Sequence, residues 1–369
     1  MKFELVIDSK PTEVVIALLK EGRLIELHRE KHDNNYSVGD IYLGKIKKIV
    51  PGLNAAFVGV GHEKDGFLHY LDLGSQLNSF KKFTDKTRTK KLNTASLKNF
   101  RKEKDTLKEG KIQDVVKSGD HLMLQVSKEP ISSKGPRLSA ELSFAGRYMV
   151  MIPFSDRVSI SQKIKSSEEK SRLKKLIHSI KPKGFGVIIR TVAEGKKVAE
   201  LDTDMKNLYK KWQIIFKKLK TANLNERIHG EMNRSSVILR DLLNSGFSKI
   251  HVNSPEIHAE LKEYLSRISP DQEKIVKLYK GEIPIFQKMN ITQQIKSSFG
   301  KTASMKSGAY LVIEHTEALH VIDVNSGKKV DSKKNQEGNA LAVNQIAVEE
   351  VARQLRLRDM GGIIVVDFI

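Results

Sequence analysis

Two aspartates near the end of the chain are the residues best suited to chemistry. Asp323 lies in the apolar segment ALHVIDVNSG, and Asp367 follows an apolar run in IIVVDFI. The stretch between them, ALAVNQIAVEEVARQLRLRDMGG, has helical character, so the pattern predicts a strand, a helix and a second strand. A parallel crossover of this kind is almost always right-handed and often places its strands side by side.

Side-by-side strands would bring the two carboxylates to one edge of a sheet, since neighbouring strands lie about 4.8 Å apart. With the amide of Asn325 close by, they would form a hard oxygen site suited to Mg²⁺. Magnesium beside a phosphodiester can activate water and stabilise developing negative charge. The alternative is that Asp323 and Asp367 only end two strands, and the residues alone leave both interpretations open.

The segments HVIDVNSG and ARQLRLRDMGGIIVVDFI resemble the catalytic core of the ribonuclease E/G family of bacterial endoribonucleases. The second match is far longer than a chance motif, and the resemblance extends from roughly residue 35 to the last residue. It implies that Asp323 and Asp367 hold a catalytic magnesium ion and that Asn325 supports them. It also implies cleavage of single-stranded RNA to 5′-phosphate and 3′-hydroxyl ends, in ribosomal RNA processing and messenger RNA decay.

The charge of the chain favours a polyanionic partner. Its 369 residues include 65 Lys and Arg against 44 Asp and Glu, a formal net charge of +21. Nucleic acid is the first candidate, because the sequence shows no lipidation signal, no signal peptide and no apolar run long enough to span a membrane. The absence of cysteine excludes disulfides, thiolate metal sites and a cysteine nucleophile, and it fits a reducing cytoplasm.

A small β-barrel is predicted where GDIYLGKIKKIVPGLNAAFVGVGHEKDGFLHYLDL alternates short strands with glycine turns. The spacing resembles the S1-type OB barrel, whose positive groove and aromatic faces bind single-stranded RNA. Phe57 and Phe67 match the family's RNA-stacking phenylalanines, and Lys134 matches its RNA-contacting lysine. The alternatives are that both phenylalanines belong to the barrel core and that Lys134 is a solvated loop residue.

A basic insertion over residues 81–111 interrupts the barrel pattern, which resumes at DHLMLQVSKE. It is either a solvated loop or short helix with no specific role, or a sequence-independent contact for phosphates. We favour a weak form of the phosphate contact. The insertion is longer than the family's usual connection at this point, so its conformation does not follow from the resemblance.

A strand ending in Arg190 and Thr191 is predicted from GFGVIIRT. A guanidinium fork and a hydroxyl at a strand end suit a terminal phosphate. The resemblance implies that this pair binds the 5′-monophosphate of RNA, together with a backbone group at Val150. The family often has two arginines after a VSIS-type segment where this chain has Gln162-Lys163, which predicts a weaker phosphate pocket.

The resemblance implies an α+β, multidomain fold: an RNase H-like subdomain with an inserted S1-type OB β-barrel and 5′-sensor subdomain, followed by the start of a DNase I-like catalytic α/β subdomain. The expected segments are 1–35 and 235–298 for the RNase H-like parts, 36–140 for the barrel, 141–234 for the sensor and its following helix, and 299–369 for the incomplete catalytic part. The helix after the sensor runs from Asp204 to about Thr221 in this interpretation, with Trp212 in its core face.

The family continues beyond the position of Ile369 with a cysteine zinc link and a small dimerising domain. We therefore expect this chain to be a fragment of a longer protein. Zn²⁺ is expected only in the missing downstream part. A homo-oligomer is expected for the full-length protein and is doubtful for this chain.

Two functions of different classes remain in competition. The first is a magnesium-dependent endoribonuclease that prefers 5′-monophosphorylated single strands, and the alternative is a non-catalytic fragment that only binds single-stranded RNA. Two carboxylates at one point of a basic groove would repel phosphate unless a metal neutralised them, which favours the nuclease. A third function, binding to DNA or a membrane surface, rests on net charge alone.

Overall fold

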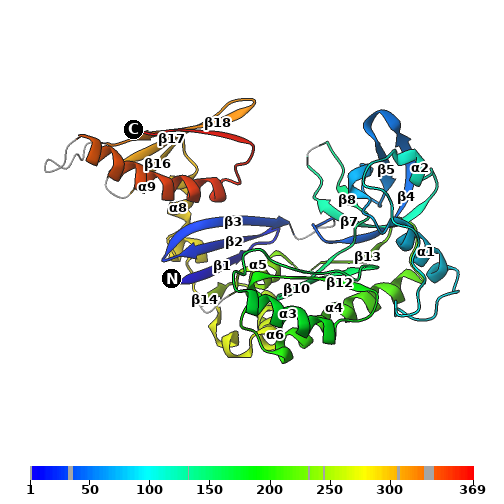
Figure 1. Cartoon of the computed structure of the whole chain (residues 1–369). Helices are drawn as coiled ribbons and strands as arrows, with labels where there is room; N and C mark the ends of the chain where they lie inside the picture. Colours follow the sequence, from blue (N-terminus) through cyan, green and yellow to red (C-terminus); the bar gives the residue numbers. More distant parts are fainter. Residues whose placement is uncertain are drawn as a thin grey trace. The chain divides into compact units, whose positions relative to one another are not determined.

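The computed structural model (Figure 1) describes residues 2–31, 36–131, 133–231, 233–243, 246–305, 308–327 and 336–369. The chain forms two compact units, one of Met1–Asp33 with Asn233–Ile369 and one of Asn34–Met232. The second unit is therefore inserted between two stretches of the first. The predicted boundary near residue 35 lies outside the described residues.

The first unit contains a five-stranded sheet built from both ends of its discontinuous chain. Its strands follow the order β15-β14-β1-β2-β3. β1 pairs in parallel with β14, so that Leu5 lies opposite Ile250. The strands of this sheet are β1 Phe3–Ser9, β2 Glu13–Lys20, β3 Arg23–Lys31, β14 Phe247–Val252 and β15 Val276–Leu278.

Both faces of this sheet are covered, which explains the nearly continuous apolar run VVIALL in β2. Leu5 and Ile7 lie in one buried cluster with residues of two helices, and Val6 lies in another on the opposite face. The helices around the sheet are α5 Arg234–Leu242, α6 Pro255–Ile268, α7 Ile285–Lys288 and α8 Ile291–Ser298. Asn233 and Ser254 begin α5 and α6 by accepting backbone hydrogen bonds.

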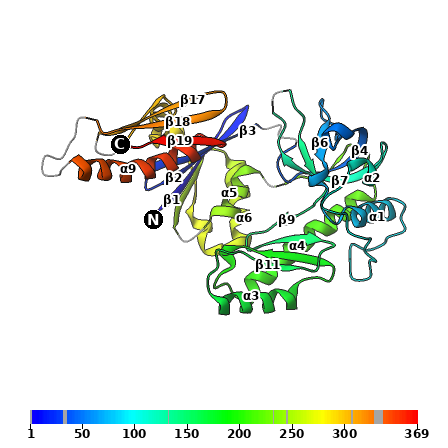
Figure 2. The same ribbon diagram turned by 45° about the horizontal axis from the view of Figure 1, so that its top comes forward.

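A second sheet of the same unit carries the candidate aspartates. Its order is β16-β17-β18-β19, and β18 and β19 are parallel. The elements are β16 Thr302–Ser304, β17 Tyr310–His315, β18 Leu319–Asn325, α9 Gln336–Leu357 and β19 Ile363–Asp367. The predicted strand, helix and strand are confirmed, and Figure 2 shows α9 beside the strands it connects.

The second unit contains a closed barrel of five strands in the order β4-β5-β6-β8-β7, closed by pairing of β4 with β7. A further short strand, β13, pairs with β4. The strands are β4 Ile41–Val50, β5 Ala55–Gly59, β6 Gly66–His69, β7 His121–Lys128, β8 Arg137–Ser139 and β13 Arg227–His229. Gly44 has no room for a side chain, because a Cβ there would lie 2.7 Å from the Cγ1 atom of Val58 on the neighbouring strand β5.

A four-stranded sheet with two helices completes the second unit, and its order is β11-β12-β10-β9. The elements are β9 Phe144–Ala145, β10 Met149–Pro153, β11 Val158–Ile160, α3 Ser167–Ile180, β12 Phe185–Ile189 and α4 Val198–Leu219. Trp212 is fully buried, as predicted. The helix begins at Val198, earlier than predicted, because the Glu200 carboxylate accepts a hydrogen bond from the Lys197 backbone at its start.

The basic insertion is ordered. It includes the helix α1 Leu77–Arg88 and is followed by the one-turn helix α2 Ile112–Val115. Phe83 of α1 is fully buried against Trp212, with ring centroids 4.8 Å apart. Short 3-10 turns complete the chain: η1 Pro51–Leu53, η2 Tyr70–Asp72, η3 Thr191–Ala193 and η4 Pro270–Ile275.

These sheets confirm a mixed α+β chain with a closed five-stranded barrel, consistent with an OB-like fold. The names RNase H-like, 5′-sensor and DNase I-like stay predictions. In the part of the chain that the structure describes, no helix is long and apolar enough to cross a lipid bilayer.

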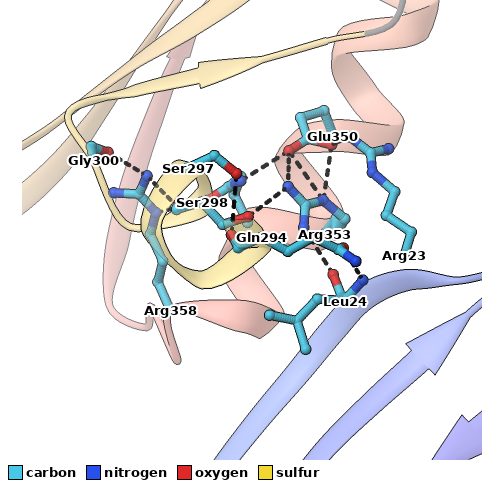
Figure 3. A network of polar contacts seen from close by, with 10 residues as sticks. Arg23, Leu24, Gln294, Ser297, Ser298, Gly300, Glu350, Arg353 and Arg358 are labelled. Carbon is cyan, nitrogen blue, oxygen red and sulfur yellow. Dashed lines mark hydrogen bonds and ion pairs between the residues drawn. The ribbon is translucent and has the colours of Figure 1, made fainter. Parts of the chain in front are cut away.

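A buried polar network holds α9 against the first sheet of its unit (Figure 3). The Glu350 carboxylate, whose residue is only 2% exposed, accepts hydrogen bonds from Arg353 at 2.6 Å and from Gln354 at 2.8 Å. Arg23 of β3 forms an ion pair with it at 2.7 Å. Arg353 also donates to the Leu24 carbonyl at 2.8 Å, which ties the helix directly to the β3 backbone.

The same network reaches α8 through the last turn of α9. Arg358 donates to the Gln354 amide oxygen at 2.7 Å, to the Ser298 carbonyl at 2.9 Å and to the Gly300 carbonyl at 2.6 Å. Arg353 and Arg358 both belong to the predicted ARQLRLRD motif. That motif therefore has a structural role, because it fixes the helix that joins the two aspartate-bearing strands.

Replacing Glu350 with alanine should lower the free energy of unfolding of the first unit by about 3 kcal/mol, because the guanidinium of Arg353 would stay partly buried without its partner. Urea unfolding followed by circular dichroism measures this change. The only tryptophan, Trp212, lies in the second unit, so its fluorescence should report an unchanged transition there. Glu349→Ala, at an exposed neighbouring position, is the control. An equal loss of unfolding free energy in that variant would contradict a special role for the network.

Candidate functional site

The structure brings Asp323 and Asp367 together as directly paired residues of the parallel strands β18 and β19. Paired residues on adjacent strands project to the same face, about 4.8 Å apart along the hydrogen-bonding direction. Both side chains are exposed. Asn325 lies two residues after Asp323 on that face and donates a hydrogen bond from Nδ2 to the Asp323 Oδ2 atom at 2.6 Å.

Strand alternation explains why these polar groups share one face. Ile322 and Val324 are buried in the cluster that also contains Ala347 and Val351 of α9. The residues between them must then point away from the helix, because successive side chains of a strand alternate between faces. The sheet therefore presents its carboxylates on the face that α9 does not cover.

The donor set fits a hard divalent cation. Two carboxylates and one amide offer oxygen ligands only, which suits Mg²⁺ better than softer metals. Among the described residues, no group of three or more His, Cys, Asp or Glu side chains is placed to hold a metal. An ion at Asp323 and Asp367 would therefore keep several water ligands, as Mg²⁺ commonly does.

Phe57 and Phe67 lie side by side on the barrel, paired across β5 and β6. Their ring centroids are 6.0 Å apart in an edge-to-face arrangement, and the Phe67 ring lies 6.5 Å from that of His69. Both phenylalanines are half-buried, while the buried core of the barrel contains Ala56, Val58 and Leu68 instead. Their rings thus form a partly exposed aromatic surface on one wall of the barrel.

Lys134 is exposed on the segment that leads into β8. Its backbone exchanges hydrogen bonds with that of Ile131, at 2.9 and 3.2 Å. The next residue must be glycine, because a Cβ on Gly135 would lie 2.2 Å from the Asp65 carbonyl oxygen. This close approach places the lysine turn against the segment that leads into β6 and Phe67.

Arg190, Thr191 and Val150 come together in the four-stranded sheet of the second unit. Val150 of β10 pairs with Ile188 of β12, and Arg190 and Thr191 follow directly after β12. The Arg190 guanidinium donates from Nη1 to the Gly146 carbonyl at 2.9 Å. The two remaining sensor candidates, Gln162 and Lys163, are both exposed.

The structure adds Ser161 to this group, which the sequence interpretation missed. Its Oγ atom lies 2.9 Å from the Thr191 Oγ1 atom, within hydrogen-bonding distance. Ser161 follows β11, a strand parallel to β12, so both hydroxyls emerge from the same end of the sheet. The VSIS segment was visible in the sequence, but only the pairing of β11 with β12 shows which residue reaches Thr191.

Two carboxylates around the sensor candidates have shifted pKa values. Hydrogen bonds from Arg172 lower the pKa of Glu169 to about 2, and the Gly195 N–H supports this anion from the turn after Thr191. Burial raises the pKa of Asp204, against the opposing effect of backbone N–H donors in residues 147–149. Neither residue was predicted, because a single acidic residue in a helical pattern carries no signal of its distant partners.

The candidate residues are divided between the two units. Asp323, Asn325 and Asp367 belong to the first unit, and all the other candidates belong to the second. Within the second unit, the barrel candidates and the sensor candidates lie on separate sheets.

This chain belongs to the ribonuclease E/G family, whose model matches residues 143–369. A ribonuclease G of Haemophilus influenzae is 34% identical over 366 residues, covering 99% of this chain and 70% of that protein. A ribonuclease G of Escherichia coli K12 is 32% identical over 369 residues, covering all of this chain and 71% of that protein. A ribonuclease E of Haemophilus influenzae is 34% identical, and the match covers all of this chain and 37% of that protein.

Proposed function

We propose that this chain is a magnesium-dependent endoribonuclease that cuts single-stranded RNA and prefers 5′-monophosphorylated substrates. The observation that carries the proposal is the direct pairing of Asp323 with Asp367 on an uncovered sheet face of a strongly basic chain. The names of its relatives, ribonuclease G and ribonuclease E, support an enzyme that acts on RNA.

Asp323 and Asp367 would hold Mg²⁺, which when bound supplies water activation and charge stabilisation at a phosphodiester. Asn325 fixes the orientation of the Asp323 carboxylate through its hydrogen bond to Oδ2. This leaves the metal-binding geometry set before RNA arrives, which reduces the reorganisation needed on binding. All three groups lie on one sheet, so the strand register alone keeps them together.

Phe57 and Phe67 would stack against unpaired bases, and Lys134 would contact the backbone close to them. Such stacking needs bases that are not already paired in a duplex, which supports a single-stranded substrate. The half-buried rings are suited to this use, because each is held by the barrel while part of its surface stays accessible.

Arg190 and Thr191, with a backbone group at Val150, would bind a 5′-terminal phosphate. The Arg190 guanidinium donates to the Gly146 carbonyl from Nη1, which holds the side chain beside β10. With Gln162-Lys163 in place of two arginines, we expect weaker discrimination between 5′ ends than a pair of arginines would give. Messenger RNA and ribosomal RNA precursors in the cytoplasm are the proposed substrates.

The second candidate function is binding of single-stranded RNA without catalysis. The barrel with its aromatic surface and the net charge of +21 would produce binding without cleavage. The expectations for Zn²⁺ and for a homo-oligomer stay predictions.

Asp323→Asn and Asp367→Asn should each reduce cleavage about a thousandfold, since loss of a metal ligand removes several kcal/mol of charge stabilisation. Affinity for a labelled A/U-rich RNA should remain nearly unchanged. Cleavage with magnesium and with EDTA, and binding by fluorescence anisotropy, measure the two effects. Glu314→Gln removes a negative charge from the same sheet and should leave cleavage unchanged. A tenth of wild-type cleavage remaining in either aspartate variant would refute the metal assignment.

Arg190→Ala should reduce the preference for 5′-monophosphate over 5′-hydroxyl RNA about tenfold, the equivalent of one hydrogen bond to a charged group. The ratio of kcat/KM for the two substrates is the measurement. Arg157→Ala, an exposed arginine of the same sheet region, is the matched control. An unchanged ratio in a folded Arg190→Ala protein would show that the 5′ end is not bound there.

A further inference from the structure

The basic insertion is fixed to the rest of its unit by an aromatic cluster. Phe83 packs on Trp212, and Phe100 packs on Phe154 with ring centroids 5.2 Å apart. The Trp212 indole N–H donates to the Ala95 carbonyl at 2.8 Å, a buried contact across 117 residues of sequence. The backbone that follows α1 is therefore held in place by the core of the sensor region.

Polar contacts fix the insertion to the barrel side as well. Lys81 forms an ion pair with Asp120 at 2.7 Å, next to the start of β7. Lys82 pairs with Glu103 and Lys102 pairs with Asp156. Three cations of the insertion therefore form ion pairs. The other cations of the insertion lie on the backbone that these contacts hold in place.

Four exposed cations lie in the C-terminal part of α1, directly after it, or on the segment that returns to this helix: Lys86, Lys90, Lys91 and Arg101. The helix ends with Lys90 in a left-handed conformation, at φ 58°, and the Lys91 N–H donates to the Lys86 carbonyl at 2.8 Å. Lys82 donates to the Arg101 carbonyl at 3.0 Å, which brings the second part of the insertion to the same helix.

The electrostatic environment of Glu103 supports this convergence. The hydrogen bond from Lys82 is the main cause of its lowered pKa, and the charges of Arg101 and Lys86 lower it further. Among the described residues, none of the four cations at the end of α1 forms an ion pair. Four positive charges on an ordered backbone, with the one nearby carboxylate of Glu103 already paired to Lys82, are suited to a ligand of repeated negative charge.

We propose that these four residues, the α1-end surface, bind the phosphate backbone of single-stranded RNA independently of its sequence. This proposal rests on the proposed function, since it assumes an RNA ligand. It adds an RNA contact to those proposed for the barrel and for Arg190 and Thr191. Cations on an ordered backbone lose less conformational entropy on binding than those of a free loop. The contact should extend the RNA footprint without selecting bases.

The test compares two triple variants that remove the same charge from the same unit. The first variant replaces Lys86, Lys91 and Arg101 with glutamine. The control variant replaces three lysines that are exposed in or near α3, which are Lys165, Lys174 and Lys175. The probe is a labelled RNA of about 30 nucleotides, longer than the roughly 16 nucleotides that one OB barrel covers at most.

The slope of log affinity against log salt should become shallower by about 2 in the first variant, because three single-strand phosphate contacts are lost. The control should keep the wild-type slope. Equal slopes in the two variants would mean that net charge alone sets the salt dependence of RNA affinity, and this would overturn the proposal. A wild-type chain that binds no RNA would overturn both the proposed function and this surface. A different outcome is that barrel variants weaken RNA binding while the first triple variant keeps the wild-type slope. That outcome would overturn only the α1-end surface and would leave the proposed function standing.

A separate set of contacts points to a positioning residue for the 5′-phosphate group. The Asp204 carboxylate of α4 accepts hydrogen bonds from the backbone N–H groups of Arg147 at 3.2 Å and Tyr148 at 2.8 Å. The turn that it holds lies between β9 and β10, immediately before Val150. Gly146 completes this turn, since a Cβ there would lie 2.5 Å from the Asp204 Oδ2 atom.

The same turn holds Arg190 at two points. The Gly146 carbonyl accepts from the Arg190 guanidinium at 2.9 Å, and the Tyr148 carbonyl accepts from the Arg190 backbone N–H at 2.8 Å. Asp204 therefore fixes the turn, and the turn fixes both the backbone and the side chain of Arg190. We infer that Asp204 positions the Arg190 guanidinium for a 5′-terminal phosphate, which rests on the proposed role of Arg190.

Asp204→Asn places an NH₂ group where one acceptor oxygen stood, with little change in volume. It should raise KM for 5′-monophosphate RNA about tenfold, the equivalent of one misplaced charged hydrogen bond, and leave kcat and KM for 5′-hydroxyl RNA unchanged. Asp202→Asn is the control, because Asp202 lies on the same helix and pairs with Lys206 at 2.5 Å. Gly146→Ala, which disturbs the same contact from the other side, should reproduce the selective loss.

Hydrogen exchange of residues 145–150 gives a readout that does not depend on cleavage, and it should accelerate in Asp204→Asn but not in the control Asp202→Asn. Retained preference for 5′-monophosphate in both Asp204→Asn and Gly146→Ala would overturn the inference while leaving the sensor intact. A wild-type chain without any such preference would overturn the sensor assignment and the positioning role together.

Discussion

The position of the aspartate-bearing strands depends on how the buried Glu350 carboxylate is satisfied. Arg353 and Gln354 of its own helix and Arg23 of β3 surround it, and Arg353 continues to the β3 backbone. A carboxylate in this environment is tolerated only with all its partners in place. Since α9 joins β18 to β19, this network couples the sheet that carries the two aspartates to the sheet built from the two distant chain segments of the first unit.

The second unit depends on a different constraint, the packing around Trp212. This residue contacts Phe83 of the insertion, Phe154 after β10 and Phe185 of β12. The barrel, the insertion and the four-stranded sheet are parts of one compact unit. A long basic segment that would be a solvated loop by composition becomes an ordered surface, because its few aromatic residues are shared with this core.

Local pattern was sufficient for much of the fold. The alternation in ALHVIDVNSG and the apolar run in IIVVDFI specified two strands, and the helical segment between them specified the connection. The early start of α4 at Val198 was missed because its signal was the contact of Glu200 with the Lys197 backbone, in a segment with weak helical periodicity. The roles of the site residues rest on the family resemblance, and their placement is what the structure adds.

The sequence by itself determined that Asp323 and Asn325 share a face and that an aspartate ends the following strand, because a strand alternates with a period of two residues. Only the tertiary structure decided that Asp367 pairs directly with Asp323, that Ser161 reaches Thr191, and that Asp204 holds the turn under Arg190. These pairings join residues separated by 30 positions or more, as between Ser161 and Thr191. Register and helix placement set them, and both result from packing of the whole unit, which no local pattern encodes.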